Sequence, residues 1–324
     1  MKAILARSFG GPEVLELAEV PDPVPGPGQV RVRVHAVGVN PYDTYQRAGG
    51  YARNPKLPYT PGADGAGIVD AVGDGVTVVS VGDRVYFGGT AVDRSIGAYA
   101  ELAVCELHQV HPLPERVSFA QGAGVNVPYA TAWRALHGRA GIRPGETLFI
   151  HGASGGVGLA ATQMGRAAGL TVIGTAGTPD GLELVRAQGA HHALNHRATG
   201  YLEELAAVTG GRGPDVILEH LANVNLDSDL AAIAPGGRIV IVGNRGRIEI
   251  DPRRAMGKEA AILGMSFWNT PADELARIHR GIGAGLELGW LTPVVGTELP
   301  LGEAARAHRL IMESGARGKI VLIP

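Results

Sequence analysis

A strand, a glycine-rich loop and a helix follow one another between residues 147 and 174, and this succession constrains the fold more than any other part of the chain. The apolar run at 148–150 leads into the loop GASGGVG at 152–158, which opens into a segment with helical periodicity. Apolar side chains share one face of that helix: Val157, Ala160, Ala161, Met164 and Ala168. A second apolar run follows at 170–174, so the pattern predicts a βαβ unit.

The glycines of this loop favour a phosphate site. They let backbone N–H groups approach a pyrophosphate, and the positive end of the following helix dipole favours the anion. A glycine-rich loop alone is weak evidence, because most such loops are only turns. Here the loop lies between two apolar runs and at the start of a helix, and that context predicts a nucleotide site.

The segment from 147 to 265 alternates between strands and helices. The expected strands are 147–151, 170–174, 190–194, 214–219, 237–242 and 260–265. The expected helices are 156–168, 180–188, 200–209 and 226–234. This alternation predicts an α/β fold, a doubly wound parallel sheet of the Rossmann type with right-handed crossovers.

The first third of the chain has a different pattern. Residues 30–39 read VRVRVHAVGV, an alternation that predicts a half-buried antiparallel strand. Other strands are expected at 3–6, 14–17, 66–72, 84–87 and 98–104, and helix at 122–127, 131–137 and 271–288. Because 304–323 adds no further βα repeat, we expect it to return to the first domain. The expected domains are a β-rich one of residues 1–124, completed by 269–324, and a Rossmann domain of residues 125–268.

Composition narrows the class of protein. A chain of 324 residues with 45% hydrophobic content can build two domain cores. The formal net charge of −2 gives no general attraction to nucleic acid or to an anionic membrane. No apolar run approaches the roughly 20 residues that cross a bilayer, and no signal peptide is visible, so we expect a cytoplasmic protein. Cys105 is the only cysteine and is expected in the core, which excludes an intrachain disulfide.

The end of the second Rossmann strand bears on which nucleotide binds. Sheets that bind NAD usually place Asp or Glu there, about 20 residues past the glycine loop, to bind the ribose 2′-hydroxyl. Here 174–178 reads GTAGT and contains no acid. This favours NADPH, with the Thr178 hydroxyl as a hydrogen-bond donor to the 2′-phosphate. The alternative is that Asp180 takes the acid's place and the cofactor is NADH. A nearby cation should complete the phosphate site. The sequence offers three candidates and does not rank them: Arg197, Arg245 and Lys319.

Several motifs resemble those of a known family. They are GVNPYDTYQRAG at 38–49, LPYTPGADGAGIV at 57–69, VPYATAWRAL at 127–136, HGASGGVG at 151–158, HLANVNL at 220–226, VGNRGRIEI at 242–250 and SGARGKIVL at 314–322. Together they resemble the medium-chain dehydrogenase/reductase superfamily, and within it the quinone oxidoreductases of the ζ-crystallin type. The resemblance covers the whole chain. It implies a GroES-like catalytic domain beside the Rossmann domain, with the nicotinamide in the cleft between them.

The resemblance also implies the residues of the site. Around the nicotinamide and substrate these are Asn40, Asp43, Tyr45, Tyr51 and Thr131. Asn40 and Tyr51 offer hydrogen-bond donors to a reduced oxygen, although Asn40 could instead only hold its turn. At the pyrophosphate the resemblance implies Ala153, Ser154, Gly155, Gly156, Val157 and Gly158, and at the adenosine ribose Gly174, Thr175, Gly177 and Thr178. The other expected cofactor residues are His196, Leu221, Gly243, Asn244, Phe267 and Lys319.

We expect no metal. In zinc-dependent relatives the catalytic ligands occupy places that correspond here to Asn40-Pro41, Gly62-Ala63-Asp64 and Val127. The cysteine and histidine ligands are gone, and tetrahedral zinc needs about four donors, which Asp64 alone cannot supply. The remaining histidine groups are expected to be ordinary surface or loop residues: His108 with His111, and His191 with His192 and His196.

Without a metal the chemistry must suit a substrate that needs little acid help, and a quinone meets this condition. The expected function is an NADPH:quinone oxidoreductase that acts on a small-molecule quinone. One alternative is an NADPH-dependent reductase of activated C=C bonds in enones or enals. A second is a non-catalytic, NADPH-sensitive RNA-binding or structural role, which the absence of a basic stripe disfavours. The resemblance implies pairing through the last Rossmann strand, and the apolar residues expected at 260–265 suit it. We therefore expect a homodimer, and a homotetramer stays open.

Overall fold

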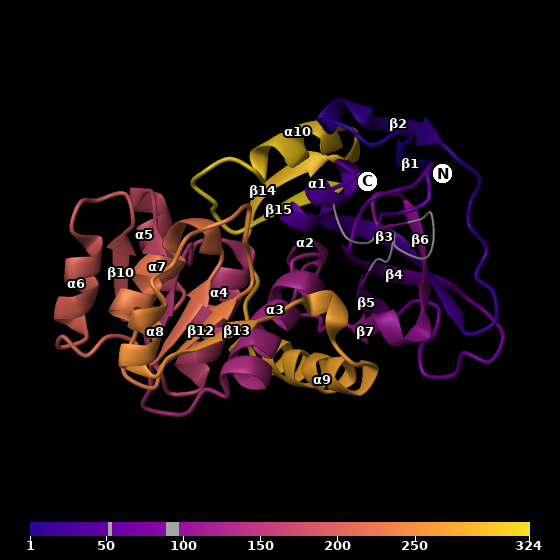
Figure 1. Ribbon diagram of the computed structural model, residues 1–324. Helices are drawn as coiled ribbons and strands as arrows, with labels where there is room; N and C mark the ends of the chain where they lie inside the picture. Colours follow the sequence, from indigo (N-terminus) through magenta and orange to yellow (C-terminus); the bar gives the residue numbers. More distant parts are fainter. Residues whose placement is uncertain (51–53, 89–96) are drawn as a thin grey trace. The chain divides into compact units, whose positions relative to one another are not determined.

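Residues 1–50, 54–88 and 97–324 are described by the computed structural model, and they divide into two units (Figure 1). Unit 1 comprises 1–127, 279–313 and 318–324, and unit 2 comprises 128–278 and 314–317. The sequence-based division assigned all of 269–324 to the first domain, whereas 269–278 and 314–317 belong to unit 2. One boundary falls inside the long helix α9 (Ala272–Leu288).

Unit 1 is built around β3 (Gln29–Val39), whose alternation buries Val30 and Val32 and leaves Arg33 and His35 exposed. This strand pairs antiparallel with three neighbours in a seven-stranded sheet of order β14-β15-β3-β4-β5-β7, in which β6 pairs only with β3. The other strands of the sheet are β4 (Asp64–Val72), β5 (Arg84–Gly88), β6 (Leu102–Glu106), β7 (Val110–Pro112), β14 (Val295–Pro300) and β15 (Lys319–Ile323). A separate antiparallel pair is formed by β1 (Lys2–Ala6) and β2 (Leu15–Glu19).

Besides residues 279–288 of α9, the described helices of unit 1 are short. They are α1 (Pro41–Arg47), α2 (Phe119–Gly122), α10 (Ala304–Leu310) and the 3-10 turns Pro12–Val14, Leu107–Gln109 and Leu301–Glu303. Pro41 occupies the start of α1, where a missing N–H costs nothing, and the carboxylate of Asp43 accepts the free N–H of Asn40. The sequence did not reveal α1, β7 or β14, because such short elements show too little periodicity. Cys105 is buried, as expected.

The sheet of unit 2 is entirely parallel and has the order β10-β9-β8-β11-β12-β13. Its strands are β8 (Thr147–Ile150), β9 (Thr171–Ala176), β10 (His192–Asn195), β11 (Val216–Glu219), β12 (Arg238–Ile241) and β13 (Ala261–Gly264). All six expected strands are present, and their order is that of the Rossmann fold. The chain order reverses between β8 and β11, where nucleotides bind in sheets of this kind.

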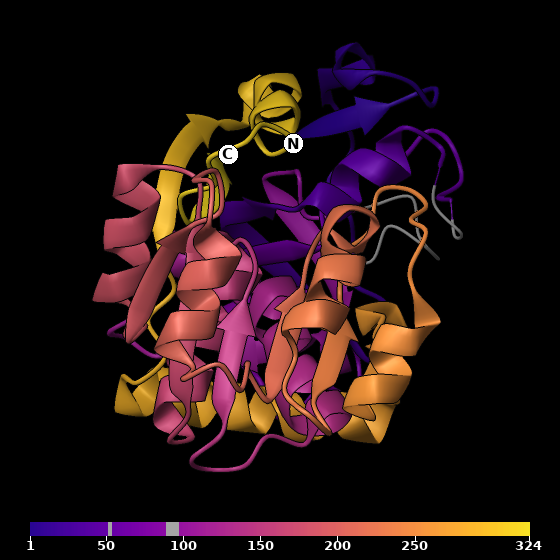
Figure 2. The ribbon, with the colours of Figure 1, turned by 60° about the vertical axis from the view of Figure 1, so that its left-hand side comes forward.

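Helices cover both faces of this sheet, and the strands pass between them (Figure 2). Phe149, Ile173 and Ile217 pack against Leu205 and Leu230 on one face. The neighbouring Leu148 and Val172 point to the other face, where they lie close to Gly165 of α4. Consecutive strand residues are apolar for this reason. The helices are α3 (Asn126–Trp133), the π-helix Arg134–Ala140, α4 (Gly156–Ala167), α5 (Pro179–Ala187), α6 (Tyr201–Val208), α7 (Ala222–Ala232), α8 (Pro252–Lys258) and the 3-10 turn Phe267–Asn269.

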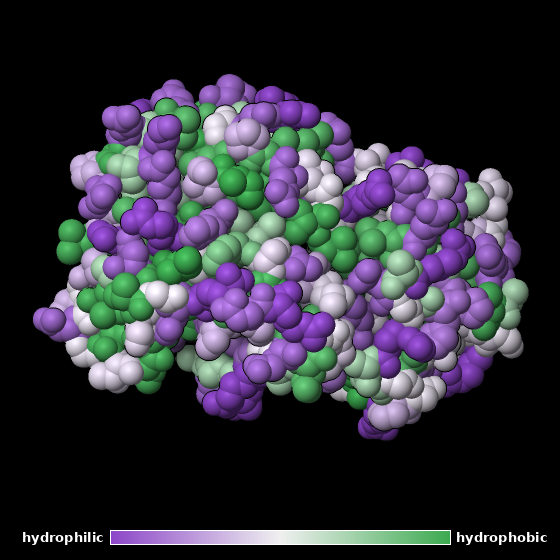
Figure 3. Space-filling view, turned by 180° about the vertical axis from the view of Figure 1, so that it is seen from behind, coloured by the Kyte–Doolittle hydropathy of each residue, from purple (hydrophilic) through white to green (hydrophobic). Residues whose placement is uncertain are grey.

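The surface is mixed in character. Hydrophilic and hydrophobic residues are interspersed over the face shown in Figure 3. Large hydrophobic side chains are exposed at scattered positions, among them Val24, Val78, Met256 and Leu288. Within the described ranges, no helix combines the length and the apolar character needed to span a bilayer.

Candidate functional site

The glycine loop joins β8 to α4 at the carboxyl edge of the parallel sheet. Gly152 has a φ of 58°, and its N–H donates to Thr175 Oγ1 at 3.0 Å. The N–H of Ala153 donates to the Thr175 carbonyl at 2.7 Å, so β9 holds the loop in place. A Cβ on Gly158 would lie 2.6 Å from Ala153 Cα, which requires glycine there. Helix α4 follows with Gly155 as its N-cap, and its first N–H groups form the kind of site that binds a pyrophosphate.

The residues after β9 form the expected adenosine end of this site. A Cβ on Gly177 would lie 2.8 Å from both Arg197 Nε and His196 Nε2, so both side chains pack on this glycine. His196 Nδ1 lies 3.2 Å from Thr175 Oγ1. Thr178 is the N-cap of α5, and its hydroxyl oxygen accepts the N–H of Gly181 at 3.1 Å, which leaves the hydroxyl hydrogen able to donate. Of the three candidate cations, Arg197 is the one beside Gly177.

The other two candidate cations lie elsewhere. Arg245 is exposed, and its N–H donates to Asn223 Oδ1 in the loop after β12. Lys319 belongs to unit 1 and is only 5% exposed. Asp180, the alternative ribose acceptor, forms an exposed ion pair with Arg317 at 2.9 Å.

Lys319 is part of a buried polar network in unit 1. Its Nζ donates to Asn40 Oδ1 at 2.6 Å and to Asp64 Oδ2 at 2.8 Å. Asn40 Nδ2 also donates to Asp64 Oδ2, at 2.9 Å, and the N–H of Val127 donates to Asp64 Oδ1 at 2.8 Å. Lys319, which was expected as a cofactor residue and as a candidate partner for the 2′-phosphate, thus has a buried ammonium that is paired with a carboxylate.

Asp43 lies beside this network. Its Oδ2 accepts the N–H of Asn40 at 2.8 Å and the Tyr99 hydroxyl at 3.4 Å, whereas its Oδ1 has no partner within the described part of the chain. Burial raises the pKa of Asp43 to about 7, and the nearby Asp64 acts in the same direction. The hydroxyl of Tyr99 also lies 3.1 Å from His308 Nε2. Two of the expected catalytic residues, Asn40 and Asp43, therefore lie together, and one is a carboxyl that exchanges its proton near neutral pH.

The other expected substrate residues are more scattered. Tyr45 is half-buried on α1, and Thr131 is buried in α3, in unit 2. Tyr51 lies outside the described residues. His111, expected at the surface, is half-buried because its ring stacks on His279 with the centroids 3.7 Å apart.

The remaining expected cofactor residues follow the ends of the later strands. Leu221 is the N-cap of α7, and Gly243 approaches the same connection so closely that a Cβ would lie 2.2 Å from the His220 carbonyl oxygen. Asn244 is exposed and donates to the Gly246 carbonyl at 2.8 Å. Phe267 is half-buried in its 3-10 turn. Leu221 and Gly243 thus share the carboxyl edge with the glycine loop.

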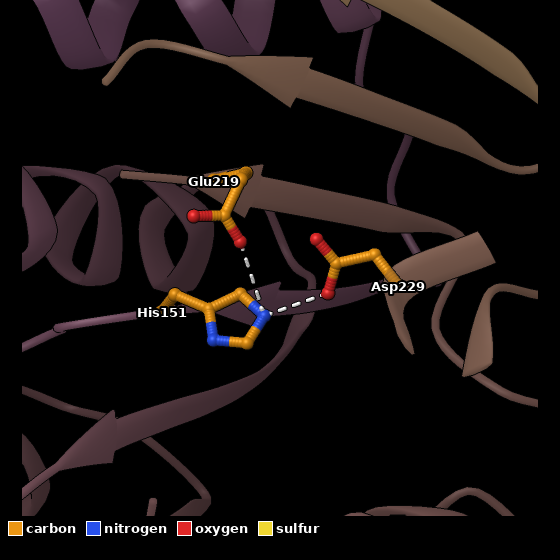
Figure 4. A group of neighbouring side chains, drawn as sticks. All are labelled: His151, Glu219 and Asp229. Atoms are coloured by element: carbon orange, nitrogen blue, oxygen red, sulfur yellow. Dashed lines mark hydrogen bonds and ion pairs between the residues drawn. The ribbon is translucent and has the colours of Figure 1, made fainter. Parts of the chain in front are cut away.

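A buried cluster at the same edge was not anticipated. His151, Glu219 and Asp229 converge from the end of β8, the end of β11 and helix α7 (Figure 4). His151 Nε2 lies 2.7 Å from Asp229 Oδ1 and 3.3 Å from Glu219 Oε2. The sequence signal for this cluster is an acid placed where core residues belong, because Glu219 ends the apolar run VIL and Asp229 precedes the apolar run LAAIA.

Comparison with known proteins places these features in a family. The model described as "Alcohol dehydrogenase GroES-like domain" matches residues 26–115, and the one described as "Zinc-binding dehydrogenase" matches 156–279. The quinone oxidoreductase of Homo sapiens is 47% identical over 100% of this chain and 98% of its own length. A solved NAD-dependent alcohol dehydrogenase has a TM-score of 0.91 at 34% identity, with both chains fully covered. The Escherichia coli quinone oxidoreductase complexed with NADPH has a TM-score of 0.88 at 30% identity, again with full coverage of both chains. The chain therefore belongs to the quinone oxidoreductases of the medium-chain dehydrogenase/reductase superfamily.

Proposed function

We propose that this protein reduces quinones with NADPH. The observation that carries the proposal is the 47% identity to the human quinone oxidoreductase over the whole chain. The start of α4 supports it, because the loop from Ala153 to Gly158 combines a required glycine with free helix N–H groups. NADPH bound there supplies the reducing equivalents, while the protein orients the reactants and excludes water.

The surroundings of Gly177 support NADPH over NADH. No acid stands at 174–178, and Arg197 and Thr178 offer a cation and a hydroxyl to a 2′-phosphate. Asp180, which an NADH site would need, is paired with Arg317. We infer that Arg197 completes the phosphate site. Replacing it in R197Q should raise the KM for NADPH about tenfold, as expected for a lost charged contact, and leave the KM for NADH unchanged. The matched control is R245Q, which removes another of the candidate cations, and an effect of R245Q equal to that of R197Q would overturn this assignment.

On the substrate side, we propose contacts from Asn40, Asp43, Tyr45 and Thr131. One amide N–H of Asn40 is bound to Asp64, so the other can donate to a substrate oxygen as it becomes reduced. Asp43 holds a proton close to neutral pH and lies one helical turn from Asn40, which suits a group that exchanges a proton during the reaction.

The proposed reaction uses no zinc. The places that bind zinc in metal-dependent relatives meet here as an amide, a carboxylate and a backbone N–H: Asn40, Asp64 and Val127. This set lacks thiolate and imidazole donors, and the ammonium of Lys319 lies against the carboxylate. The residues therefore do not fit the metal named in the description of the matching family model.

We further infer a homodimer formed through β13. This strand is the last in the order of its sheet, so one of its edges has no partner strand among the described residues. Its residues alternate between half-buried and exposed, and Ile262 is 39% exposed. Pairing with a second copy would satisfy the free backbone groups and cover these side chains. Light scattering that gives the monomer mass of 33.5 kDa would contradict this inference.

The test of the function is the oxidation of NADPH, and separately of NADH, with 9,10-phenanthrenequinone, an enone or an aldehyde as acceptor and a chelator present throughout. We expect turnover of the quinone with NADPH preferred. Turnover of the enone alone would establish the alkene-reductase alternative instead. Bound NADPH without turnover of any acceptor would refute the catalytic assignment.

A further inference from the structure

The cluster of His151, Glu219 and Asp229 is sealed inside unit 2. The three residues are 5%, 0% and 0% exposed. Both carboxylates face one ring nitrogen, His151 Nε2, as Figure 4 shows. The other oxygen of Glu219 accepts the N–H of Leu221 and, at 3.3 Å, the amide of Asn225. The ring nitrogen hydrogen-bonds to Asp229 Oδ1, and neither Asp229 Oδ2 nor Glu219 Oε2 has a hydrogen-bond partner among the described residues. A single imidazole nitrogen therefore lies against both carboxylates.

No arginine or lysine among the described residues is bonded to this cluster. Two buried carboxylates without a cation cannot both stay ionised, because each would lose its hydration and repel the other. Burial accordingly raises the pKa of Glu219 and of Asp229 to about 7 and lowers that of His151. The cluster therefore holds a proton under conditions in which free Asp and Glu have lost theirs.

The same residues are attached to the loops that surround the expected cofactor. His151 is followed at once by Gly152, the first residue of the glycine loop, and its carbonyl accepts the ring N–H of His220 at 2.6 Å. Glu219 holds the N–H of Leu221 through its side chain, and its carbonyl accepts the N–H of Gly243 at 3.2 Å. A change of charge in the cluster consequently acts on the glycine loop and on the connections after β11 and β12.

We propose that dinucleotide binding is coupled to protonation of this cluster, so that unit 2 takes up a proton there when a pyrophosphate occupies the adjoining glycine loop. The inference rests on the proposed function, since it assigns a further property to the same nucleotide site. Negative charge brought next to His151 stabilises the protonated cluster, and by linkage the protonated cluster favours the nucleotide. Affinity is highest at the pH where the cluster holds its proton and weakens as the pH rises.

Other titratable groups face the cluster and enter the test. They are His220 from the connection after β11, His196 from the end of β10 and Tyr201 from the start of α6. A bound 2′-phosphate also titrates near pH 6. His196 packs on Gly177, beside which we propose that this phosphate binds. NADH, which lacks that phosphate, removes the contribution of the phosphate. The variants of Glu219 and Asp229 separate the cluster from the protein groups.

The experiment is isothermal titration calorimetry of the full chain with NADPH and with NADH, each in two buffers of different ionisation enthalpy, from pH 6 to pH 9. The slope of the binding enthalpy against the ionisation enthalpy gives the protons taken up per nucleotide. The variants are D229N and E219Q, whose amides keep an acceptor oxygen but cannot bind the proton. The matched control is D227N, on the same helix but partly exposed and paired with Arg254.

We expect the wild type and D227N to take up protons with both nucleotides, and their affinity to weaken about 5- to 10-fold across the titration. In D229N and E219Q the uptake with NADH should disappear. Binding of NADH to the wild type without proton uptake, or equal uptake by D229N, would overturn this inference but leave the proposed function intact. A stoichiometric divalent metal in the purified protein, lost in D229N, would also overturn it. If neither nucleotide binds the wild type, the proposed function falls together with the inference. The wild-type and E219Q titrations keep the test decisive if D229N does not fold.

Discussion

Asp64 of unit 1 and the acidic pair Glu219 and Asp229 of unit 2 are buried in opposite ways. Asp64 of unit 1 meets a cation, Lys319, and further donors on both of its oxygens. Glu219 and Asp229 of unit 2 meet only one imidazole and a few N–H groups. A buried ion pair with satisfied hydrogen bonds keeps one arrangement, whereas buried acids without a cation keep a proton and can release it. The first kind fixes geometry, and the second kind responds to charge nearby.

The difference matches the tasks that we propose for the two units. Asn40 must present an amide to the substrate in one orientation, and both Lys319 and Asp64 fix that amide. The glycine loop must bind a ligand that carries several negative charges. A neighbouring cluster that gains a proton becomes less negative and so repels this ligand less.

The largest expected effect follows the loss of the cation in unit 1. Replacing Lys319 with Met leaves Asp64 buried without a counter-charge, and removing one partner of a buried pair typically costs about 3–5 kcal/mol. We expect the free energy of unfolding in urea to fall by that amount and quinone reduction to be lost. The double variant K319M/D64N should recover much of the stability, because it removes the stranded charge. If K319M lowers the free energy of unfolding by less than about 1 kcal/mol, the pair of Lys319 and Asp64 contributes no more than a solvent-exposed ion pair does.

The second effect comes from crowding the same network. A Cβ on Gly38 would lie 1.9 Å from the Ala123 carbonyl oxygen and 2.7 Å from Lys319 Cε. G38A should therefore destabilise the protein by about 2–3 kcal/mol, as overpacking does when backbone atoms must move. The matched control is G283A in helix α9, where an added Cβ meets nothing within 4 Å. That variant should gain up to about 1 kcal/mol from helix propensity, and equal urea midpoints for the two variants would contradict the packing argument.

The architecture of unit 2 could be predicted from the sequence more completely than that of unit 1, and the reason is physical. The inner strands of the parallel sheet are covered on both faces, so they form continuous apolar runs such as LFI at 148–150. In unit 1, β14 pairs in parallel with β15, and β15 pairs with β3 from the other end of the chain. Such pairings depend on tertiary contacts that no local pattern reveals.

The same distinction holds for the site. The glycine loop is local, and its glycines together with the flanking apolar runs predicted the βαβ unit that the structure shows. The Lys319 network is not local, since Lys319 lies 279 residues from Asn40 and 255 from Asp64. The family resemblance named Lys319 as a cofactor residue, and only the fold showed its ion pair with Asp64. His151 and Asp229 are likewise separated by 78 residues, which hid their contact.

The third prediction uses pH to separate the two kinds of site. The pKa of Asp229 rises from 3.8 to about 7 on folding, so the folded state binds more protons than the unfolded state between these values. This contribution to stability is complete below pH 4 and is lost as the pH rises through 7. D229N, which cannot titrate, should therefore gain stability relative to the wild type by about 1–2 kcal/mol between pH 5 and pH 8.5. Urea unfolding at the two pH values measures this difference, and parallel stability curves would show that Asp229 does not hold the proton.

The smallest effect comes from giving unit 2 the cation that it lacks. Asn225 lies 3.3 Å from Glu219 Oε1 and is half-buried on α7, so the substitution N225K places an ammonium at the edge of the cluster. A cation there favours the ionised carboxylate, and the cluster should then resemble the ion pair of unit 1. We expect a gain of about 0.5–1 kcal/mol at pH 8.5 relative to pH 6, together with weaker proton uptake when NADH binds. V224K adds the same charge at an exposed position on the same helix and should do neither. If N225K and V224K behave alike, the added charge acts from the surface, and the contrast between the two units would not depend on a cation at the buried carboxylates.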